Sequence, residues 1–101
     1  MKNLGELTIG DIIYKIHWEG GHIGYIDKYK VNRIYDVKIG RIIHYGDDDY
    51  FITLKFDELN EPIQTDYYIE QFCSDKHKLT ELIEYDRDEC LFRYKEILNS
   101  I

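Results

Sequence analysis

The sequence predicts a mostly β domain of the α+β class. We expect a small barrel or curled antiparallel sheet of five to six strands, followed by one C-terminal amphipathic helix. Isoleucine is abundant, alanine is absent and 10 of the 101 residues are tyrosines, and both isoleucine and tyrosine favour strands. Short alternating segments recur between clusters of turn residues. Helical spacing of apolar residues is clear only in the last segment.

The N-terminal half of the chain is expected to supply the first three strands. Residues 9–17 begin with a turn-forming Gly-Asp pair and then alternate, which predicts a strand with one apolar face. That face would hold Ile12, Tyr14 and Ile16. Residues 29–40 alternate less regularly, which predicts a second strand with a bend or bulge. Residues 41–45 form the third predicted strand.

The clearest hairpin signal lies in the middle of the chain. The turn-forming letters "GDDD" separate residues 41–45 from residues 50–56, a predicted fourth strand. Its side chains on one face would be Tyr50, Ile52, Leu54 and Phe56. A connection with the only proline, Pro62, leads to a predicted fifth strand over residues 64–72.

The C-terminal region changes its pattern after Phe72. Residues 79–85 could form a short strand or a first helical turn, and we favour the strand. Residues 86–101 predict an amphipathic helix, with Asp86 as N-cap and Glu89 three residues later in a box-like start. Packing this helix on the sheet would close the core of a single domain, residues 1–101.

Charge is distributed unevenly along the chain. The net charge is −7, of which residues 1–46 contribute +2 and residues 47–101 contribute −9. Affinity for nucleic acid comes largely from lysines and arginines that displace counterions, so direct nucleic-acid binding is not expected. The negative net charge instead favours a partner protein with a basic surface. Without a secretory or membrane-spanning apolar run, we expect no membrane partner and a cytoplasmic location.

The acidic residues of the second half suggest where such a partner would bind. Two runs, "DDD" and "EYDRDE", would join into one acidic face that imitates nucleic acid, although a solvated turn and helix capping explain the same runs without a partner. The candidate partner-binding residues are Asp47, Asp48, Asp49, Glu84, Asp86, Asp88 and Glu89.

The stretch "HWEGGHIGY", residues 17–25, allows two interpretations. We favour a tight connection between strands, in which Gly20 and Gly21 supply positive φ angles. The alternative is the rim of a small-molecule pocket, built by His17, Trp18, His22 and Tyr25. There the indole of Trp18 would stack on a nucleotide-like ligand.

An arginine would balance the phosphate charge of such a ligand. The candidate ligand or contact residues are Trp18, His22, Tyr25, Arg33 and Arg41. The histidines of this stretch lack any recognised metal-ligand spacing, so we expect no metal and no cofactor.

Catalytic signatures are absent from the sequence. There is no nucleophile elbow, P-loop or zincin motif. Cys73 and His77 could form a thiolate pair if they lay on a helix, but their segment reads as a loop. Cys73 and Cys90 form neither a CxxC pair nor a disulfide framework, which predicts reduced thiols. We therefore expect a protein without enzymatic activity.

The order of segments resembles that of small uncharacterised phage and prophage proteins. The matching stretches are "GDIIYKI", "YKVNRI", "YYIEQF" and "YDRDECLFRYKEIL". This resemblance implies an SH3-like barrel with an acidic terminal helix, encoded on a mobile element. Some proteins of similar size and acidity from that setting inhibit host defence systems.

Together these features favour a binding protein that inhibits a host protein, such as a nucleic-acid-handling defence factor, in the manner of anti-CRISPR proteins. The alternative is a module that binds or sequesters a nucleotide-like small molecule. Exposed tyrosines would also suit a homo-oligomer.

Overall fold

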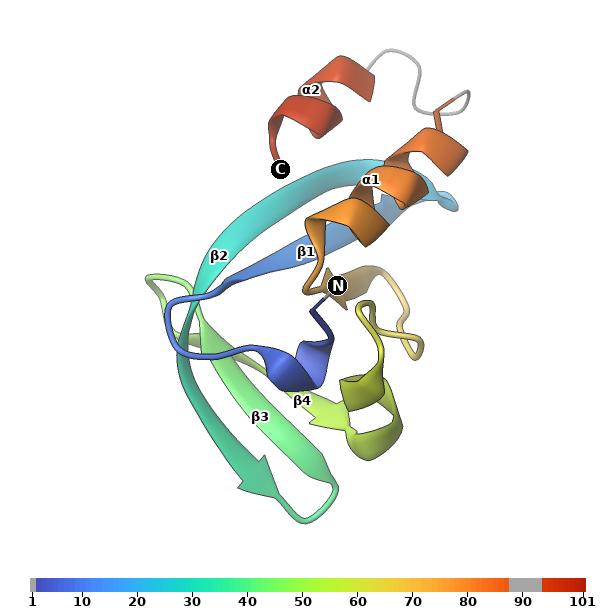
Figure 1. The fold of residues 1–101 in the computed structure, drawn as a ribbon. Helices are drawn as coiled ribbons and strands as arrows, with labels where there is room; N and C mark the ends of the chain where they lie inside the picture. The colour runs from blue at the N-terminus through green and yellow to red at the C-terminus, as the bar shows by residue number, and fades with distance from the viewer. Residues whose placement is uncertain (1, 88–93) are drawn as a thin grey trace.

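The computed structural model describes residues 2–87 and 94–101. A five-stranded antiparallel sheet, in the order β4-β3-β2-β1-β5, curls into a half-barrel (Figure 1). Its strands are β1 (Ile12–Glu19), β2 (His22–Val37), β3 (Gly40–Tyr45), β4 (Tyr50–Lys55) and β5 (Glu70–Cys73). The described helices are α1 (Lys76–Tyr85), α2 (Tyr94–Asn99) and the short 3-10 helices η1 (Leu4–Glu6) and η2 (Phe56–Asn60). The mostly β, curled architecture that the sequence predicts is confirmed.

β2 is the longest strand and joins the two parts of the sheet. Its first half, up to Lys30, pairs with β1, and its second half, from Val31, pairs with β3. A register shift between Val31 and Arg33 interrupts the second pairing, which confirms the irregularity expected within residues 29–40. β2 begins well before its predicted start. A register shift beside His17 and Trp18 of β1 places Gly24 inside β2 as the extra residue of a β-bulge.

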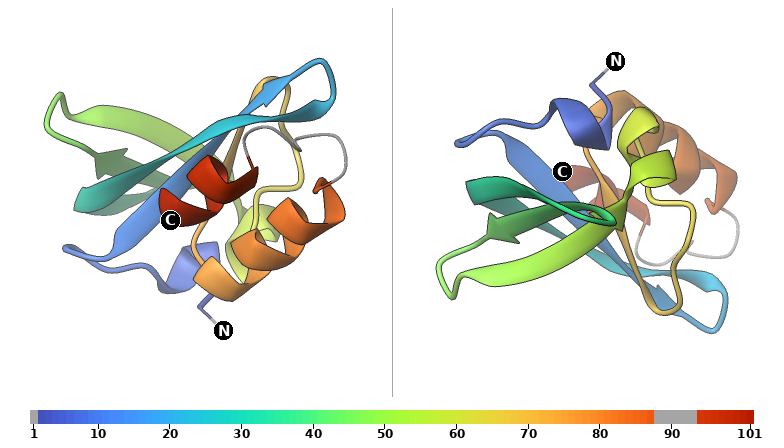
Figure 2. Two further views of the ribbon diagram at one scale, coloured as in Figure 1. Left: turned by 90° about the horizontal axis from the view of Figure 1, so that it is seen from above. Right: turned by 90° about the horizontal axis from the view of Figure 1, so that it is seen from below.

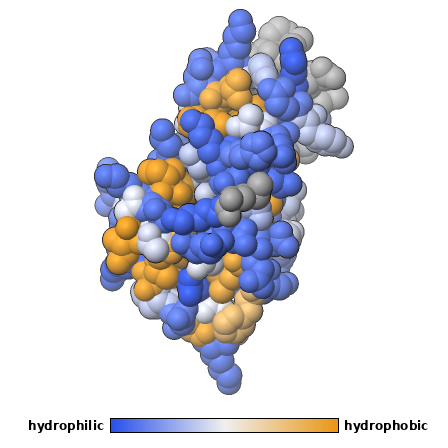
Figure 3. All heavy atoms as spheres, viewed as in Figure 1, coloured by the Kyte–Doolittle hydropathy of each residue, from blue (hydrophilic) through white to orange (hydrophobic). Residues whose placement is uncertain are grey.

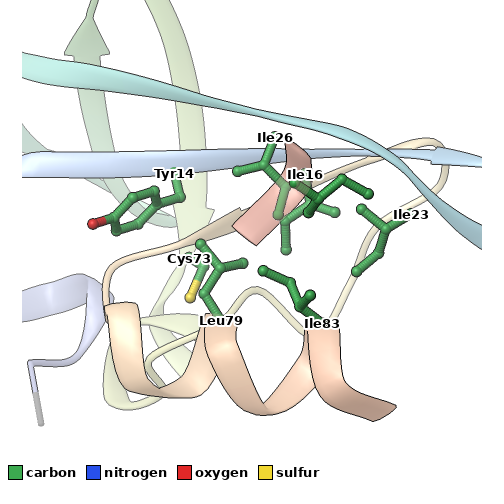
Figure 4. Packing of buried hydrophobic residues seen from close by; sticks show 8 residues of the cluster. Tyr14, Ile16, Ile23, Ile26, Cys73, Leu79 and Ile83 are labelled. Carbon is green, nitrogen blue, oxygen red and sulfur yellow. The ribbon is translucent and has the colours of Figure 1, made fainter. Parts of the chain in front are cut away.

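β1 buries side chains on both of its faces because successive residues of a strand point in opposite directions. Tyr14 and Ile16 pack with α1 on the face that we call the helix face (Figure 4). Ile12 packs against the same cluster, so the predicted common face is confirmed. Ile13 points to the opposite face, here called the barrel face, and packs with Ile43 of β3.

The predicted hairpin around "GDDD" is confirmed. β3 and β4 pair in register from Tyr45 with Tyr50 at the turn to Gly40 with Lys55 at the open end. The prediction fails for Phe56, which is the first residue of η2 and is exposed, because the chain leaves the sheet after Lys55.

The fifth strand is much shorter than predicted. Only Glu70–Cys73 pairs with β1. The Gln64 amide donates to the Phe72 carbonyl at 2.8 Å, and the Ser74 amide to the Pro62 carbonyl at 2.8 Å, so residues 62–64 run beside the end of β5. The residues between must form a loop, which leaves the adjacent tyrosines 67 and 68 exposed instead of on opposite faces of a strand.

The predicted strand over residues 79–85 is wrong, because these residues belong to α1. The Asp75 carboxylate caps the helix by accepting a hydrogen bond from the Lys78 amide at 2.9 Å. Leu79 and Ile83 are four residues apart, so a helix presents both to the sheet, and both are fully buried (Figure 4).

The sequence predicts one C-terminal helix, over residues 86–101, whereas the structure has two, α1 and α2. Asp86 is not its N-cap but the residue that follows α1, where its carboxylate accepts a hydrogen bond from the Ile23 amide at 2.9 Å. α2 covers the later part of the predicted helix, and Asp88, Glu89 and Cys90 lie outside the described residues.

Candidate functional site

The stretch "HWEGGHIGY" forms the β1–β2 hairpin. Gly20 and Gly21 are its two turn residues, with φ angles of 59° and 83°. Two successive positive φ angles define the type I′ turn, whose twist matches that of the flanking strands. The favoured interpretation, a tight connection between strands, is confirmed.

The four residues of the alternative pocket rim do not meet in one place. Trp18 packs against the helix-face core and donates its indole N–H to Gln71 Oε1 at 3.1 Å. The Nδ1 atom of His22 is 3.2 Å from the Asp86 carboxylate. His17 stacks instead on Tyr25, with ring centroids 3.9 Å apart. Only His17 and Tyr25 lie together.

The two candidate arginines lie far from Trp18. Trp18 pairs with Ile23 of β2. Arg33 lies ten residues further along the same strand, which is a length of roughly 30 Å measured along the strand. Arg33 contacts the Asp49 carboxylate. Arg41 donates to the Gly5 carbonyl at 2.6 Å. The structure therefore does not bring an arginine to a ligand stacked on Trp18.

The acidic residues predicted as one surface fall into two separate groups. The three aspartates 47–49 form the turn between β3 and β4, whereas Glu84 and Asp86 lie at the end of α1. Figures 1 and 2 place that turn and the end of α1 at opposite ends of the molecule. The described acidic residues thus do not form one continuous face.

Two of these aspartates have structural partners. Asp49 contacts Arg33 and has a φ angle of 53°. Asp86 is buried, so its place on an accessible surface is corrected: its carboxylate fastens the end of α1 to β2.

Cys73 and His77 do not form a thiolate pair. Cys73 is fully buried in β5, and burial raises the pKa of its thiol to about 11. His77 lies on α1, exposed, with its Nε2 3.1 Å from Glu81 Oε1. The thiol is therefore protonated at neutral pH and shielded from solvent.

A cluster that the sequence did not reveal lies on the barrel face of β1, β2 and β5. The strand register places His17 between Tyr25 of β2 and Glu70 of β5, and places Lys15 beside Asp27. We call these five residues, Lys15, His17, Tyr25, Asp27 and Glu70, the barrel-face cluster. Their side chains converge because they occupy alternate positions on paired strands.

His17 is held between two carboxylates. Its Nε2 is 3.2 Å from Asp27 Oδ2, and its Nδ1 is 4.0 Å from Glu70 Oε1. The Tyr29 hydroxyl donates to the same Asp27 oxygen at 3.2 Å. Because the carboxylates flank opposite ring nitrogens, the three groups are not arranged around one point, as a metal ion would require.

Lys15 closes the other end of the cluster. Its Nζ lies 3.3 Å from Glu70 Oε2 and within 5.8 Å of the ring centroids of Tyr45, Tyr50 and Phe72. Burial alone would lower the pKa of the amine, but Tyr45 and Glu70 outweigh it and raise that pKa above its ordinary value. Lys15 is therefore a fixed cation in an aromatic surround.

The phenols near the cluster also stay in their neutral form. Burial raises the pKa of Tyr45, and burial with the Asp27 carboxylate raises that of Tyr29. The ammonium and phenols thus keep their ordinary protonation at neutral pH. This arrangement can donate and accept hydrogen bonds and pair with cations, and it lacks an amine or phenolate poised as a base.

One sequence signal could have revealed the cluster. The Gly20-Gly21 turn sets the pairing of the hairpin, which places the polar residues of β1 opposite those of β2. The extra residue Gly24 hides this, because it shifts the partner of His17 from position 24 to Tyr25. Without that shift, Tyr25 would point to the helix face.

Within residues 2–87 and 94–101, no three His, Cys, Asp or Glu side chains are grouped to hold a metal ion. In the same part of the chain, no helix has the length and apolarity needed to span a bilayer. Comparison with family models, curated proteins and solved structures finds no match to this chain.

Proposed function

We propose that this protein is a non-enzymatic binding protein of mobile-element type that engages and inhibits a host protein with a basic surface. The partner class is a nucleic-acid-handling defence factor, as for anti-CRISPR proteins, and the site of action is the host cytoplasm. The binding surface is the barrel-face cluster with the tyrosines around it. The acid-rich second half of the chain, with the resemblance to phage proteins, motivates this class of partner.

The observation that carries the proposal is the combination of acidic and aromatic groups at one place. The side chains of Asp27 and Glu70 are each 42% exposed. Tyr25 and Tyr50 are about half exposed beside them, at 48% and 49%. Carboxylates can pair with lysines and arginines of a partner, and tyrosines supply amphipathic contact area.

The loop before β5 carries further aromatic groups beside Trp18, on the helix-face side of β1. Tyr67 stacks beside Trp18 with ring centroids 6.0 Å apart, and Tyr68 and Ile69 are exposed next to it. On the face seen in Figure 3, hydrophobic residues form small patches separated by hydrophilic ones. On that face a contact of mixed polar and apolar groups fits better than a large apolar interface.

The protonation of the buried groups supports binding over catalysis. A nucleophile or general base is activated by a pKa shifted toward neutrality. In this protein the pKa values of Cys73, Lys15 and Tyr45 are shifted upward, away from neutral pH.

The first experiment is a pulldown from a lysate of a low-GC bacterial host at low and high salt. The variant that tests the site is Asp27→Asn with Glu70→Gln, which keeps hydrogen-bonding groups and removes two charges. The matched control is Asp57→Asn with Glu61→Gln, which removes two exposed charges at η2. We expect a nucleic-acid-handling protein to bind at low salt, to be released at high salt, and to be lost only with the site variant.

Equal binding by both variants would place the contact outside the barrel-face cluster. Recovery of a nucleotide without any protein would contradict the proposal and support the small-molecule alternative. Quenching of Trp18 fluorescence by nucleotides would then report that ligand.

A further inference from the structure

In the part of the chain that the structure describes, the first half of β2 has one edge without a neighbouring strand. Residues up to Lys30 pair with β1 on one side, and β3 pairs only from Val31 onward. Among the residues that the structure describes, none pairs as a strand with the other side of this half. Such an edge carries backbone donors and acceptors that a further strand can use.

The hydrogen bonds around Val31 show which residues present those groups. The Val31 amide donates to the Asp11 carbonyl and its carbonyl accepts from the Gly10 amide, both at 2.8 Å, so Val31 faces the β1 side. The Lys30 carbonyl accepts from the Gly46 amide at 3.0 Å on the β3 side. Backbone groups alternate between the two edges along a strand. Since the register is regular from Ile26 to Lys30, Ile26 and Lys28 direct their N–H and C=O groups to the open edge.

Two grooves lie along this part of β2, one lined by Ile26 and the other by Lys28. One of about 320 Å³ lies between residues 24–27 of β2 and α2, where Glu96 and Ile97 line it. The other, of about 450 Å³, lies between residues 28–32 of β2 and the β3–β4 turn, where Asp47 and Asp48 line it. The open edge is thus bordered by a helix at one end and by an acidic turn at the other.

We propose that this edge binds an extended, basic peptide segment of the partner as an added β-strand. The inference rests on the proposed function and names how the partner is held. Backbone hydrogen bonds to Ile26 and Lys28 would supply the pairing, and side chains would supply specificity. Peptide residues on the barrel face would meet Asp27, away from the Lys28 side chain on the helix face.

Charge favours a basic peptide over a second copy of the chain. Four carboxylates line the edge and its grooves, those of Asp27, Asp47, Asp48 and Glu96, against the two lysines 28 and 30. In a two-fold dimer, pairing of Ile26 with Lys28 of the other copy would place Asp27 directly opposite its counterpart. Like charges opposite each other on paired strands are destabilising.

The test uses a labelled peptide of alternating lysine and threonine, whose lysines can all lie on one face, and measures its binding by fluorescence anisotropy. Lys28→Pro removes the edge N–H and blocks pairing, and proline is tolerated where the N–H faces away from the ladder. Lys28→Thr is the matched control, because it removes the same charge and keeps the N–H. We expect Lys28→Pro to weaken binding about ten-fold relative to Lys28→Thr.

Equal affinity of the two variants, or no binding to the wild type, would overturn the proposal. So would a wild-type dimer in sedimentation that Lys28→Pro abolishes without any peptide binding. Amide hydrogen exchange provides a check that needs no variant: the Lys28 amide should exchange fast and the Asp27 amide slowly in the free protein. A protected Lys28 amide would contradict an open edge.

The two proposals can fail separately. If Lys28→Pro still retains the lysate partner that the Asp27→Asn with Glu70→Gln variant loses, the edge is not used and the proposed function stands. If the peptide binds at the edge and the lysate yields no partner, the edge proposal stands and the proposed function fails.

Discussion

The two faces of the β1–β2 hairpin differ sharply, although they are built from alternate residues of the same strands. On the helix face Ile16, Ile23 and Ile26 are at most 4% exposed under α1 and α2. On the barrel face, beyond the barrel core, the neighbouring positions are polar or aromatic, and Asp27 and Tyr25 remain about half exposed.

This difference separates stability from binding. Burial of an isoleucine side chain stabilises a fold by about 1.5–3 kcal/mol, whereas a solvent-exposed ion pair contributes about 0–1 kcal/mol. The helix face therefore holds the hairpin in place. The charged groups of the barrel face are not needed for that purpose, which leaves them available for a partner.

The largest expected effect is a difference in stability between variants of two adjacent residues of β1, Ile16 and His17. Ile16→Ala should lower the free energy of unfolding by about 2–5 kcal/mol, because it leaves a cavity where a fully buried side chain packed beneath α1. His17→Ala should lower it by only about 1 kcal/mol, since it removes one ring stacked on Tyr25. Urea denaturation of both variants measures the difference, and similar losses would contradict the division between the faces.

The free energy of unfolding should also depend on pH in the alkaline range, because the helix-face core contains the Cys73 thiol. The pKa of Cys73 rises from 9.0 to about 11 in the fold, so the folded state holds this proton more tightly than the unfolded state. Its contribution, about 3 kcal/mol, is complete below pH 9 and is lost as pH rises from 9 to about 11. Cys73→Ala should flatten the pH dependence of unfolding over that interval. An unchanged slope would show that other groups, such as the tyrosines, account for it.

The smallest expected effect on stability is that of the site variant. Asp27→Asn with Glu70→Gln should change the free energy of unfolding by less than about 1 kcal/mol, because both carboxylates are partly solvated. Thermal unfolding beside the Asp57→Asn with Glu61→Gln control checks this. A large loss in the site variant alone would mean that the barrel-face cluster is a structural network.

The predicted parts of the fold follow from local patterns. The alternation of Ile12, Tyr14 and Ile16 placed β1, and "GDDD" placed the hairpin of β3 and β4. Local patterns failed where a distant contact decides the outcome. Asp86 looks like a helix N-cap by its position before an apolar repeat, yet its carboxylate accepts a hydrogen bond from Ile23 of β2.

The candidate site divides in the same way. His17 and Tyr25 were named from the sequence as part of the alternative pocket rim, but Lys15, Asp27 and Glu70 were not. They meet only because Gly24 shifts the register of the hairpin and because β5 adds Glu70 from far along the chain. The Gly-Gly turn fixes the pairing at the tip of the hairpin, but neither the shift at Gly24 nor the arrival of β5 has a local pattern in the sequence.

By itself the sequence determined that the chain forms a curled, mostly β fold with a tight Gly-Gly hairpin, because alternation and turn residues act over a few neighbours. Only the tertiary structure decided that residues 79–85 form a helix. Within residues 2–87 and 94–101, it also decided which acidic residues stay exposed and that no strand pairs with one edge of the first half of β2. Those outcomes depend on register and on contacts between distant segments, where one shifted residue reverses the face that every following side chain occupies.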